Sequence, residues 1–341
     1  MAQFASSPEW QTTLRTLIPL QDDVQRYKDV YLTAFFKISE KEMLFDVITQ
    51  NFDATVMSQL IDRFPVGKVF NVLGVGIGEG KHELYFLEGL GKDCNRLSFT
   101  AVEPSSAMLQ AFERNVATSG VSEKTTLQLL ACTLSQFFNS RTPIDTKFKL
   151  ISAIHSIYYT GDLEITFHQL TSLLHDNGVL IIVVSDSNLP ITTNFCLKTL
   201  TGVKEELMIT AQRVIMLAKR HGFEVQKISI PLSLDVTELF DESSEFGSKL
   251  LDFLTSTSHF RRSVPSKISS AVTSFYRSLA KESEKGRFEL SADNAMLIIK
   301  KGCYFHNWFG LVREDILSFG FVTVGIVLSN LKGTKGNICM L

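Results

Sequence analysis

Apolar and polar residues follow one pattern over the first 66 residues of the chain and another pattern after them. In the first part, apolar residues recur three and four apart within 12–20, 24–36 and 39–64, which is the spacing of one face of a helix. Ser39 precedes two glutamates and an apolar run, as an N-cap residue does. We therefore expect an N-terminal helical region that ends near Pro65.

From residue 68 onward, short apolar runs alternate with amphipathic segments. Continuous apolar strands that alternate with helices are typical of a parallel sheet covered on both faces, so the pattern predicts an α/β fold. The predicted strands are 69–74, 97–103, 125–131, 148–157, 177–186, 223–231 and 294–300. The predicted helices between them are 79–90, 105–119, 134–140, 162–176 and 203–221.

Two later segments interrupt this alternation. Residues 233–290 are polar, carry several phenylalanines, and are predicted to form a helical insertion over one edge of the sheet. The segment 302–341 contains an apolar, β-branched run at 320–331 for which the predicted sheet has no place. An extra strand, an aberrant carboxyl terminus and a disordered tail all remain open for it. We thus expect three parts: residues 1–66, a main domain at 67–301, and the extension 302–341.

The first predicted strand ends in Gly74, Gly76 and Gly78, which are spaced two apart. Glycine is needed where the backbone adopts a positive φ or where a ligand lies against it, and the N–H groups of a following helix start can bind a polar ligand group. The spacing differs from the dinucleotide fingerprint and lacks the ending of a P-loop. A turn that binds no ligand is the alternative. If a ligand is bound, a side chain at Gly76 should block it.

The second predicted strand ends in Glu103 and Pro104. A carboxylate at this point of a doubly wound sheet is placed to accept ribose hydroxyls, and its distance from the glycines is close to the roughly 20 residues expected. An ordinary charge at the end of a strand is the alternative. Together with the glycine turn, Glu103 favours a cofactor that contains adenosine.

Composition narrows the class of protein. The chain has 341 residues, a formal net charge of −2 and 26 phenylalanines, which is a globular composition without the basic surplus of a nucleic-acid-binding protein. Its 5 cysteines lack the spacing of a disulfide framework or of a zinc site, so we expect no metal. The sequence shows no signal peptide and no apolar stretch of about 18 residues. We expect a reduced, cytoplasmic protein that does not bind membranes.

Several segments resemble one enzyme family. The glycine turn and Glu103 are similar to those of the class I S-adenosylmethionine-dependent methyltransferases, which have a Rossmann-like seven-stranded sheet. Further segments resemble the histamine N-methyltransferase family in particular, and the resemblance runs from about residue 27 to residue 302. The matching segments are 73–79, 102–105, 158–159, 180–185 and 251–255.

The resemblance implies S-adenosylmethionine as the cofactor, in contact with residues along the carboxyl ends of the first four strands. Met108 stands where the family has an amide, so any contact there becomes apolar. Val72 stands where many class I enzymes have an acidic residue. The positions implied for the cofactor are Gly74, Gly76, Gly78, Glu103, Pro104, Met108, Thr133, Leu134 and Ile154.

The resemblance also implies a substrate side, formed by Glu40, Tyr158, Tyr159, Phe253 and Ala292. Glu40 matches the carboxylate that the family uses on its amine substrate, although a charge in the first turn of a helix is the ordinary interpretation of this residue. The paired tyrosines follow the fourth strand, where they would form a wall for a planar or cationic substrate. Two partly buried tyrosines with satisfied hydroxyls are an equally good interpretation.

Two positions depart from the family. His155 replaces a glutamine, and Ala292 lies near the place of an asparagine, unless Ser291 or Asp293 takes that place after a shift of register. We expect His155 to be catalytic, either by orienting the substrate N–H or by taking a proton after transfer. A simple hydrogen-bond donor in the pocket wall is the alternative.

The expected function is therefore N-methylation of a small imidazole or amine, such as histamine or a histidine-containing dipeptide, by a monomer. A non-catalytic protein of the same fold that binds S-adenosylmethionine is the alternative.

Overall fold

In the computed structural model, contacts group Met1–Lys301 into one unit and Gly302–Leu341 into another. The residues that the structure describes are 13, 16–38, 41–62, 64–65, 67–140, 146–187, 209–284 and 286–302. The expectations for Ser39, Glu40 and the extension after Gly302 therefore lie outside the described residues. No helix within the described ranges is long and apolar enough to cross a membrane.

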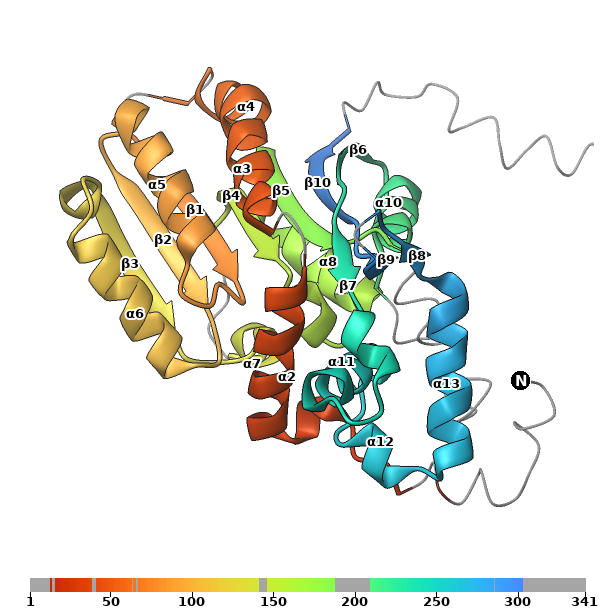
Figure 1. Ribbon diagram of the computed structural model, residues 1–341. Coiled ribbons are helices and arrows are strands. Elements are labelled where there is room, and N and C mark those ends of the chain that lie inside the picture. The colour runs from red at the N-terminus through yellow and green to blue at the C-terminus, as the bar shows by residue number, and fades with distance from the viewer. Residues whose placement is uncertain are drawn as a thin grey trace, which may run out of the picture. The chain divides into compact units, whose positions relative to one another are not determined.

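The centre of the first unit is a seven-stranded sheet in the order β3-β2-β1-β4-β5-β10-β6 (Figure 1). This confirms the predicted α/β fold and the predicted return of the last strand to the sheet. Neighbouring strands from β3 to β5 are parallel. The strands are β1 (Phe70–Val75), β2 (Leu97–Val102), β3 (Thr125–Leu130), β4 (Phe148–Ile154), β5 (Leu174–Ser185), β6 (Phe223–Ile230) and β10 (Asn294–Lys301).

The parallel arrangement that the alternation predicts does not extend to the last strand, since β10 is antiparallel to both β5 and β6. The chain enters β10 from an insertion that follows β6, so β10 runs in the opposite direction between its two neighbours. Residues 294–299 are all buried. Burial on both faces is what the uninterrupted apolar run of β10 requires of a central strand.

Helices cover both faces of the sheet (Figure 1). On one face, α5 (Lys81–Asp93) and α6 (Ser106–Ala117) pack with the N-terminal segment. Phe52 of that segment stacks on Phe86 of α5, with 4.1 Å between ring centroids. The predicted helix 39–64 is a composite of α3 (Lys41–Asn51), a π-helical stretch (Phe52–Met57) and α4 (Ser58–Ile61). On the other face lie α7 (Leu134–Asn139), α8 (Leu163–Leu173) and α10 (Ala211–Arg220).

The insertion after β6 is only partly helical, which corrects the prediction for 233–290. It contains a small antiparallel sheet in the order β7-β9-β8, because the chain returns on itself before it enters β10. These strands are β7 (Ser233–Asp235), β8 (Lys281–Glu282) and β9 (Phe288–Ser291), and the helices are α11 (Glu245–Thr255), α12 (Phe260–Ser263) and α13 (Ser266–Leu279).

Helix α2 (Val24–Lys37) packs on this insertion, beside α11 (Figure 1). Arg26 binds Asp252 through two nitrogens, each 2.7 Å from Oδ2. The side chain of Asp252 is 1% exposed, and its two oxygens also accept the N–H groups of His259 and Phe260. Because a buried carboxylate needs such partners, Asp252 fixes where α2 begins relative to α11.

Candidate active site

Four parallel strands, β1, β2, β4 and β5, bring their carboxyl ends to one edge of the sheet. In a doubly wound fold this is the edge at which ligands bind. The glycine turn follows β1 at this edge, Glu103 follows β2, and His155 follows β4. The structure therefore gathers residues that the sequence analysis selected from separate segments.

The three glycines of the turn serve different purposes. A Cβ on Gly74 would lie 2.5 Å from the side chain of Ile77, and one on Gly76, whose φ is +61°, would lie 2.4 Å from Cβ of Ser156. Gly78 has a φ of +56°, and a Cβ there would meet no atom within 4 Å. Packing of the chain on itself accounts for Gly74, and packing on Ser156 together with the positive φ accounts for Gly76. Contact of these glycines with a ligand stays a prediction. Gly78 alone faces open space.

Glu103 joins the end of β2 to this turn. Its Oε2 accepts the N–H of Gly78 at 3.1 Å, and its Oε1 accepts the N–H of Ser105 at 2.9 Å. A carboxylate oxygen can accept more than one hydrogen bond, and Glu103 is only half-buried. It can thus hold the turn and still accept hydroxyl groups of a ligand.

The other residues predicted to contact the cofactor differ in how deeply they are buried. Pro104 and Met108 are exposed, and Ile154 is half-buried at the end of β4. Thr133 caps α7, because its hydroxyl accepts the N–H of Gln136 at 3.2 Å while the Gln136 side chain accepts the Thr133 N–H at 2.8 Å. Leu134 is buried in the core below. The open space at Gly78 and the carboxylate of Glu103 fit an adenosine-containing cofactor.

Glu83 lies in the first turn of α5, below the glycine turn, and the sequence analysis missed it. It is 2% exposed, and its Oε1 accepts the hydroxyl of Ser152 at 2.9 Å. Burial raises the pKa of Glu83 to about 7, although the hydrogen bond from Ser152 opposes this shift. A carboxyl group among the apolar positions of a predicted helix was the signal that could have revealed it.

His155 has a strained backbone, with a φ of +51°, which is uncommon for a residue other than glycine and often marks a functional site. Its N–H donates to the Val183 carbonyl at 3.0 Å, so the strain is held by β5. The ring stacks on Tyr158 with centroids 6.4 Å apart. Burial lowers the pKa of His155 to about 4, so the imidazole is neutral at pH 7.

Tyrosines from two distant segments form a cluster that reaches this histidine through Tyr158. The Tyr158 hydroxyl accepts the N–H of Ser185 at 2.5 Å, and the hydroxyls of Tyr159 and Tyr27 share a hydrogen bond of 2.5 Å. Tyr31 stacks on Tyr27 at 6.1 Å. Burial raises the pKa of Tyr27 and of Tyr158, so both stay neutral. Tyr27 and Tyr31 were missed, although their spacing of four on a predicted helix places both on one face.

His82, in the first turn of α5, adds a second imidazole near His155. Burial, followed by the proximity of His155 and of Lys81, lowers the pKa of His82 to about 4. Its Nε2 is enclosed and has no hydrogen-bond partner among the described residues, and its ring lies 5.2 Å from that of Phe45. We name the group Tyr27, Tyr31, His82, His155, Tyr158 and Tyr159 the aromatic wall.

The remaining substrate positions lie in the insertion. Phe253 and Ala292 are half-buried and pack against the hydrophobic cluster of α11 and α13. Ser291 and Asp293 were considered as replacements for the family's asparagine. They bind each other, since the Ser291 hydroxyl donates a hydrogen bond to the Asp293 carboxylate at 2.7 Å. The adjacent Asn294, which the sequence analysis did not weigh, is an amide that is 8% exposed at the start of β10.

Comparison of the sequence with known proteins shows to which family the chain belongs. A family model described as a methyltransferase domain matches residues 25–228. The chain belongs to the methyltransferase domain family. Together with the sheet order, this identifies a class I methyltransferase fold and an S-adenosylmethionine-dependent methyltransferase.

Curated relatives cover most of this methyltransferase. Histamine N-methyltransferase of Danio rerio is 27% identical over 76% of this chain and 89% of its own length. The enzyme of the same name from Xenopus tropicalis is 25% identical over 75% and 87%. Carnosine N-methyltransferase 2 of Gallus gallus is 25% identical over 64% and 70%. Among solved structures, the plantazolicin methyltransferase BamL aligns with a TM-score of 0.44 and 14% identity over 86% of this chain and 98% of its own.

Proposed function

We propose that this methyltransferase transfers a methyl group from S-adenosylmethionine to a neutral nitrogen of a small imidazole or amine, such as histamine or a histidine-containing dipeptide. The observation that carries the proposal is the aromatic wall, whose two imidazoles have pKa values lowered to about 4 and whose tyrosines have raised pKa values. Distant relatives named for histamine and carnosine support the same substrate class.

The cofactor half of the site consists of the glycine turn and Glu103. When bound, S-adenosylmethionine supplies an electrophilic methyl group on its sulfonium. Glu103 would accept ribose hydroxyls while it holds the Gly78 N–H, and the open space beside Gly78 lets the ligand approach the backbone. Pro104, Met108, Thr133, Leu134 and Ile154 remain predicted contacts around this centre.

The role of His155 follows from its protonation. A group with a pKa of about 4 is a weak proton acceptor at pH 7, so orientation of the substrate N–H is favoured over removal of its proton. A free imidazole has a pKa near 6.5, and its neutral form is therefore available without a strong base. Catalysis would come mainly from holding the nucleophilic nitrogen in line with the methyl group.

The tyrosines and Glu40 would select the substrate. Aromatic faces favour planar and cationic groups, and the Tyr27–Tyr159 pair presents two rings edge to face at 6.4 Å. Glu40 remains the predicted partner of a substrate ammonium, by its match to the family's carboxylate. Phe253 and Ala292 remain predicted contacts on the side of the insertion.

A second candidate is a non-catalytic protein that binds S-adenosylmethionine. The observation in its favour is the replacement of the family's two substrate amides by His155 and Ala292. Ser291 and Asp293, which bond to each other, are poor substitutes for the second amide. Binding of the cofactor without any turnover would support this candidate.

Incubation of the full chain with labelled S-adenosylmethionine and a panel of imidazoles and amines tests the proposal. We expect label in at least one imidazole or amine and none in matched alcohols or thiols. Thermal shift with S-adenosylmethionine, measured in parallel, reports binding. If the protein binds S-adenosylmethionine but transfers no methyl group to any member of the panel, the second candidate, a non-catalytic binding protein, is the correct one.

Glu40→Gln separates recognition of the amine from a structural role. If Glu40 binds a substrate ammonium, the variant should raise KM for amine-bearing imidazoles, because a charge-assisted hydrogen bond is lost. KM for an imidazole without the amine and the affinity for S-adenosylmethionine should stay unchanged. Equal effects on both substrates would contradict this role.

A further inference from the structure

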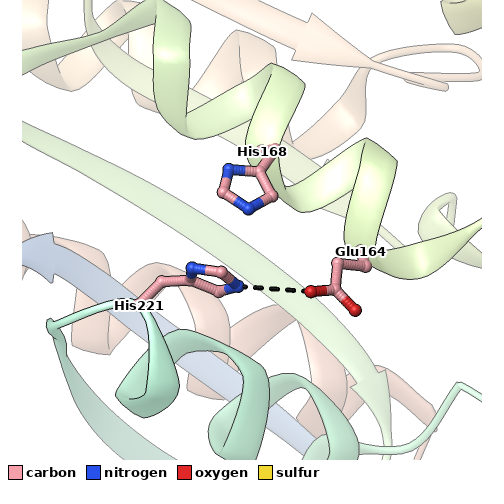
Figure 2. Close-up of side chains that lie close together, drawn as sticks. All are labelled: Glu164, His168 and His221. Carbon is pink, nitrogen blue, oxygen red and sulfur yellow. Dashed lines mark ion pairs between the residues drawn. The ribbon is translucent and has the colours of Figure 1, made fainter.

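Three potential metal ligands lie together on the helical layer of α8 and α10, and none of them belongs to the candidate active site. One ligand atom of each of Glu164, His168 and His221 lies within 4.8 Å of those of the other two. Figure 2 shows Glu164 and His168 on successive turns of α8, with His221 facing them from the end of α10.

The local structure holds these side chains in place. Glu164 and His168 are four residues apart on α8, so they share one helix face. His221 ends α10, where its N–H donates to the carbonyls of Leu217 and Ala218 at 3.2 and 3.1 Å. Gly222, with a φ of +77°, then turns the chain into β6. The two elements thus present their ligands across one short gap.

The distances approach those of a tetrahedral metal site. Bonds of about 2.0–2.1 Å to histidine nitrogen and carboxylate oxygen place neighbouring ligand atoms roughly 3.3 Å apart around Zn²⁺. Nε2 of His221 lies 3.6 Å from Oε1 of Glu164, and the rings of His168 and His221 lie 4.3 Å apart between centroids. All three ligand atoms lie within 4.8 Å of one another, so the side chains would have to draw together to share one ion.

His221 supplies an independent reason to expect a ligand. Its Nε2 is enclosed by protein and makes no hydrogen bond to any described residue. A buried polar atom without a partner costs roughly 1–3 kcal/mol, and a metal ion would remove that cost. The nitrogen is directed toward Glu164 (Figure 2).

The neighbouring arginine is compatible with a metal. Arg220 binds Oε2 of Glu164 at 3.0 Å, which leaves Oε1 toward His221. Residues that hydrogen-bond to a ligating carboxylate commonly orient it. The competing interpretation is a polar cluster in which Glu164 binds Arg220 and lies beside His221 without a metal.

We propose that Glu164, His168 and His221 bind one divalent transition-metal ion of the zinc type, with water as the fourth ligand. Imidazole and carboxylate are ligands that such ions accept, and a three-residue site completed by water is a common arrangement. The ion bridges α8 and the end of α10, so it stabilises the packing of the helical layer.

The test uses the untagged full chain after treatment with a chelator. Calorimetry with Zn²⁺ and absorption spectroscopy with Co²⁺ should each give one saturable equivalent, and Zn²⁺ should raise Tm. His168→Ala and His221→Ala should each weaken binding about 100-fold and abolish the rise in Tm. His175→Ala, which removes a histidine from β5 outside the cluster, is the matched control and should bind like the wild type.

Circular dichroism checks that each variant folds, and His168→Asn repeats the test with a smaller change of shape. The Co²⁺ spectrum should lack a thiolate charge-transfer band, because the proposed ligands contain no sulfur. Absence of saturable binding, or a thiolate band, would overturn the proposal. Binding that both cluster variants retain would do the same.

Discussion

The two halves of the candidate active site are built in different ways. The cofactor half comes from one stretch, residues 70–105, and its contacts run through backbone groups, as when Glu103 accepts the N–H groups of Gly78 and Ser105. The aromatic wall combines side chains from α2, from α5 and from the segment after β4. The first half depends on local backbone conformation, whereas the second depends on how distant helices dock.

The docking contacts show the same contrast. Helix α2 is held by the buried Arg26–Asp252 pair and by an ion pair between Lys37 and Glu238. The glycine turn is held instead by the neighbouring strand ends, because Gly76 packs on Ser156, which follows β4, and donates its N–H to the Val102 carbonyl at 2.7 Å. Substitutions should therefore separate the two halves.

The largest effect is expected from Asp252→Ala, which removes the anchor of α2. Loss of one member of a buried ion pair costs about 3–5 kcal/mol, and we expect this decrease in the free energy of unfolding in urea. Lys301→Ala is the control, since it breaks an ion pair with Asp176, whose side chain is 88% exposed, and should cost at most about 1 kcal/mol. Equal costs for the two variants would show that α2 does not depend on Asp252.

Matched alanine substitutions in the turn come next. Gly76→Ala should lower the free energy of unfolding for two reasons. Alanine at a positive φ costs about 1–2 kcal/mol, and the clash of its Cβ with Ser156 costs about 1–3 kcal/mol. Gly78→Ala should cost only the first of these, because its Cβ meets no atom within 4 Å. Calorimetry should show weaker binding of S-adenosylmethionine by Gly78→Ala, because its methyl group enters the open space. If the affinity of Gly78→Ala for S-adenosylmethionine is unchanged, the cofactor does not bind at this turn.

Glu83→Gln tests the burial of a carboxyl group beneath the turn. The pKa of Glu83 is about 7 in the folded protein against an ordinary value of 4.5, so the folded state binds more protons between these values. Its contribution to stability is full below pH 4.5 and is lost as pH rises through 7, by up to about 3 kcal/mol. Urea unfolding from pH 4.5 to pH 8 should show this fall in the wild type. A fall of the same size in Glu83→Gln would assign it to another group.

The smallest effect is expected from Tyr159→Phe, which removes the hydrogen bond to Tyr27 in the aromatic wall. One neutral hydrogen bond contributes about 0.5–1.5 kcal/mol, so KM for the methyl acceptor should rise severalfold while the affinity for S-adenosylmethionine stays the same. Tyr85→Phe is the control, because the Tyr85 hydroxyl donates to Asp53 at 2.6 Å. It should leave KM unchanged. An equal change of KM in both variants would argue against a substrate role for the wall.

The sequence by itself determined the α/β fold, most strand positions and the glycine turn that follows β1. Apolar runs reveal strands because both faces of a central strand are buried, and the turn after β1 is visible because Gly76 and Gly78 adopt positive φ values. The spacing of Glu103 from these glycines is also a local property. Each of these features is encoded within about one βα unit.

Only the tertiary structure decided the direction of β10, the small sheet of the insertion, and the partners of the aromatic wall. Tyr27 and Tyr159 are 132 residues apart, and no local pattern links them. The pKa values of Glu83 and His155 depend on burial by several elements. The cluster of Glu164, His168 and His221 likewise forms only when α10 ends beside α8, because contacts across the sequence are set by packing.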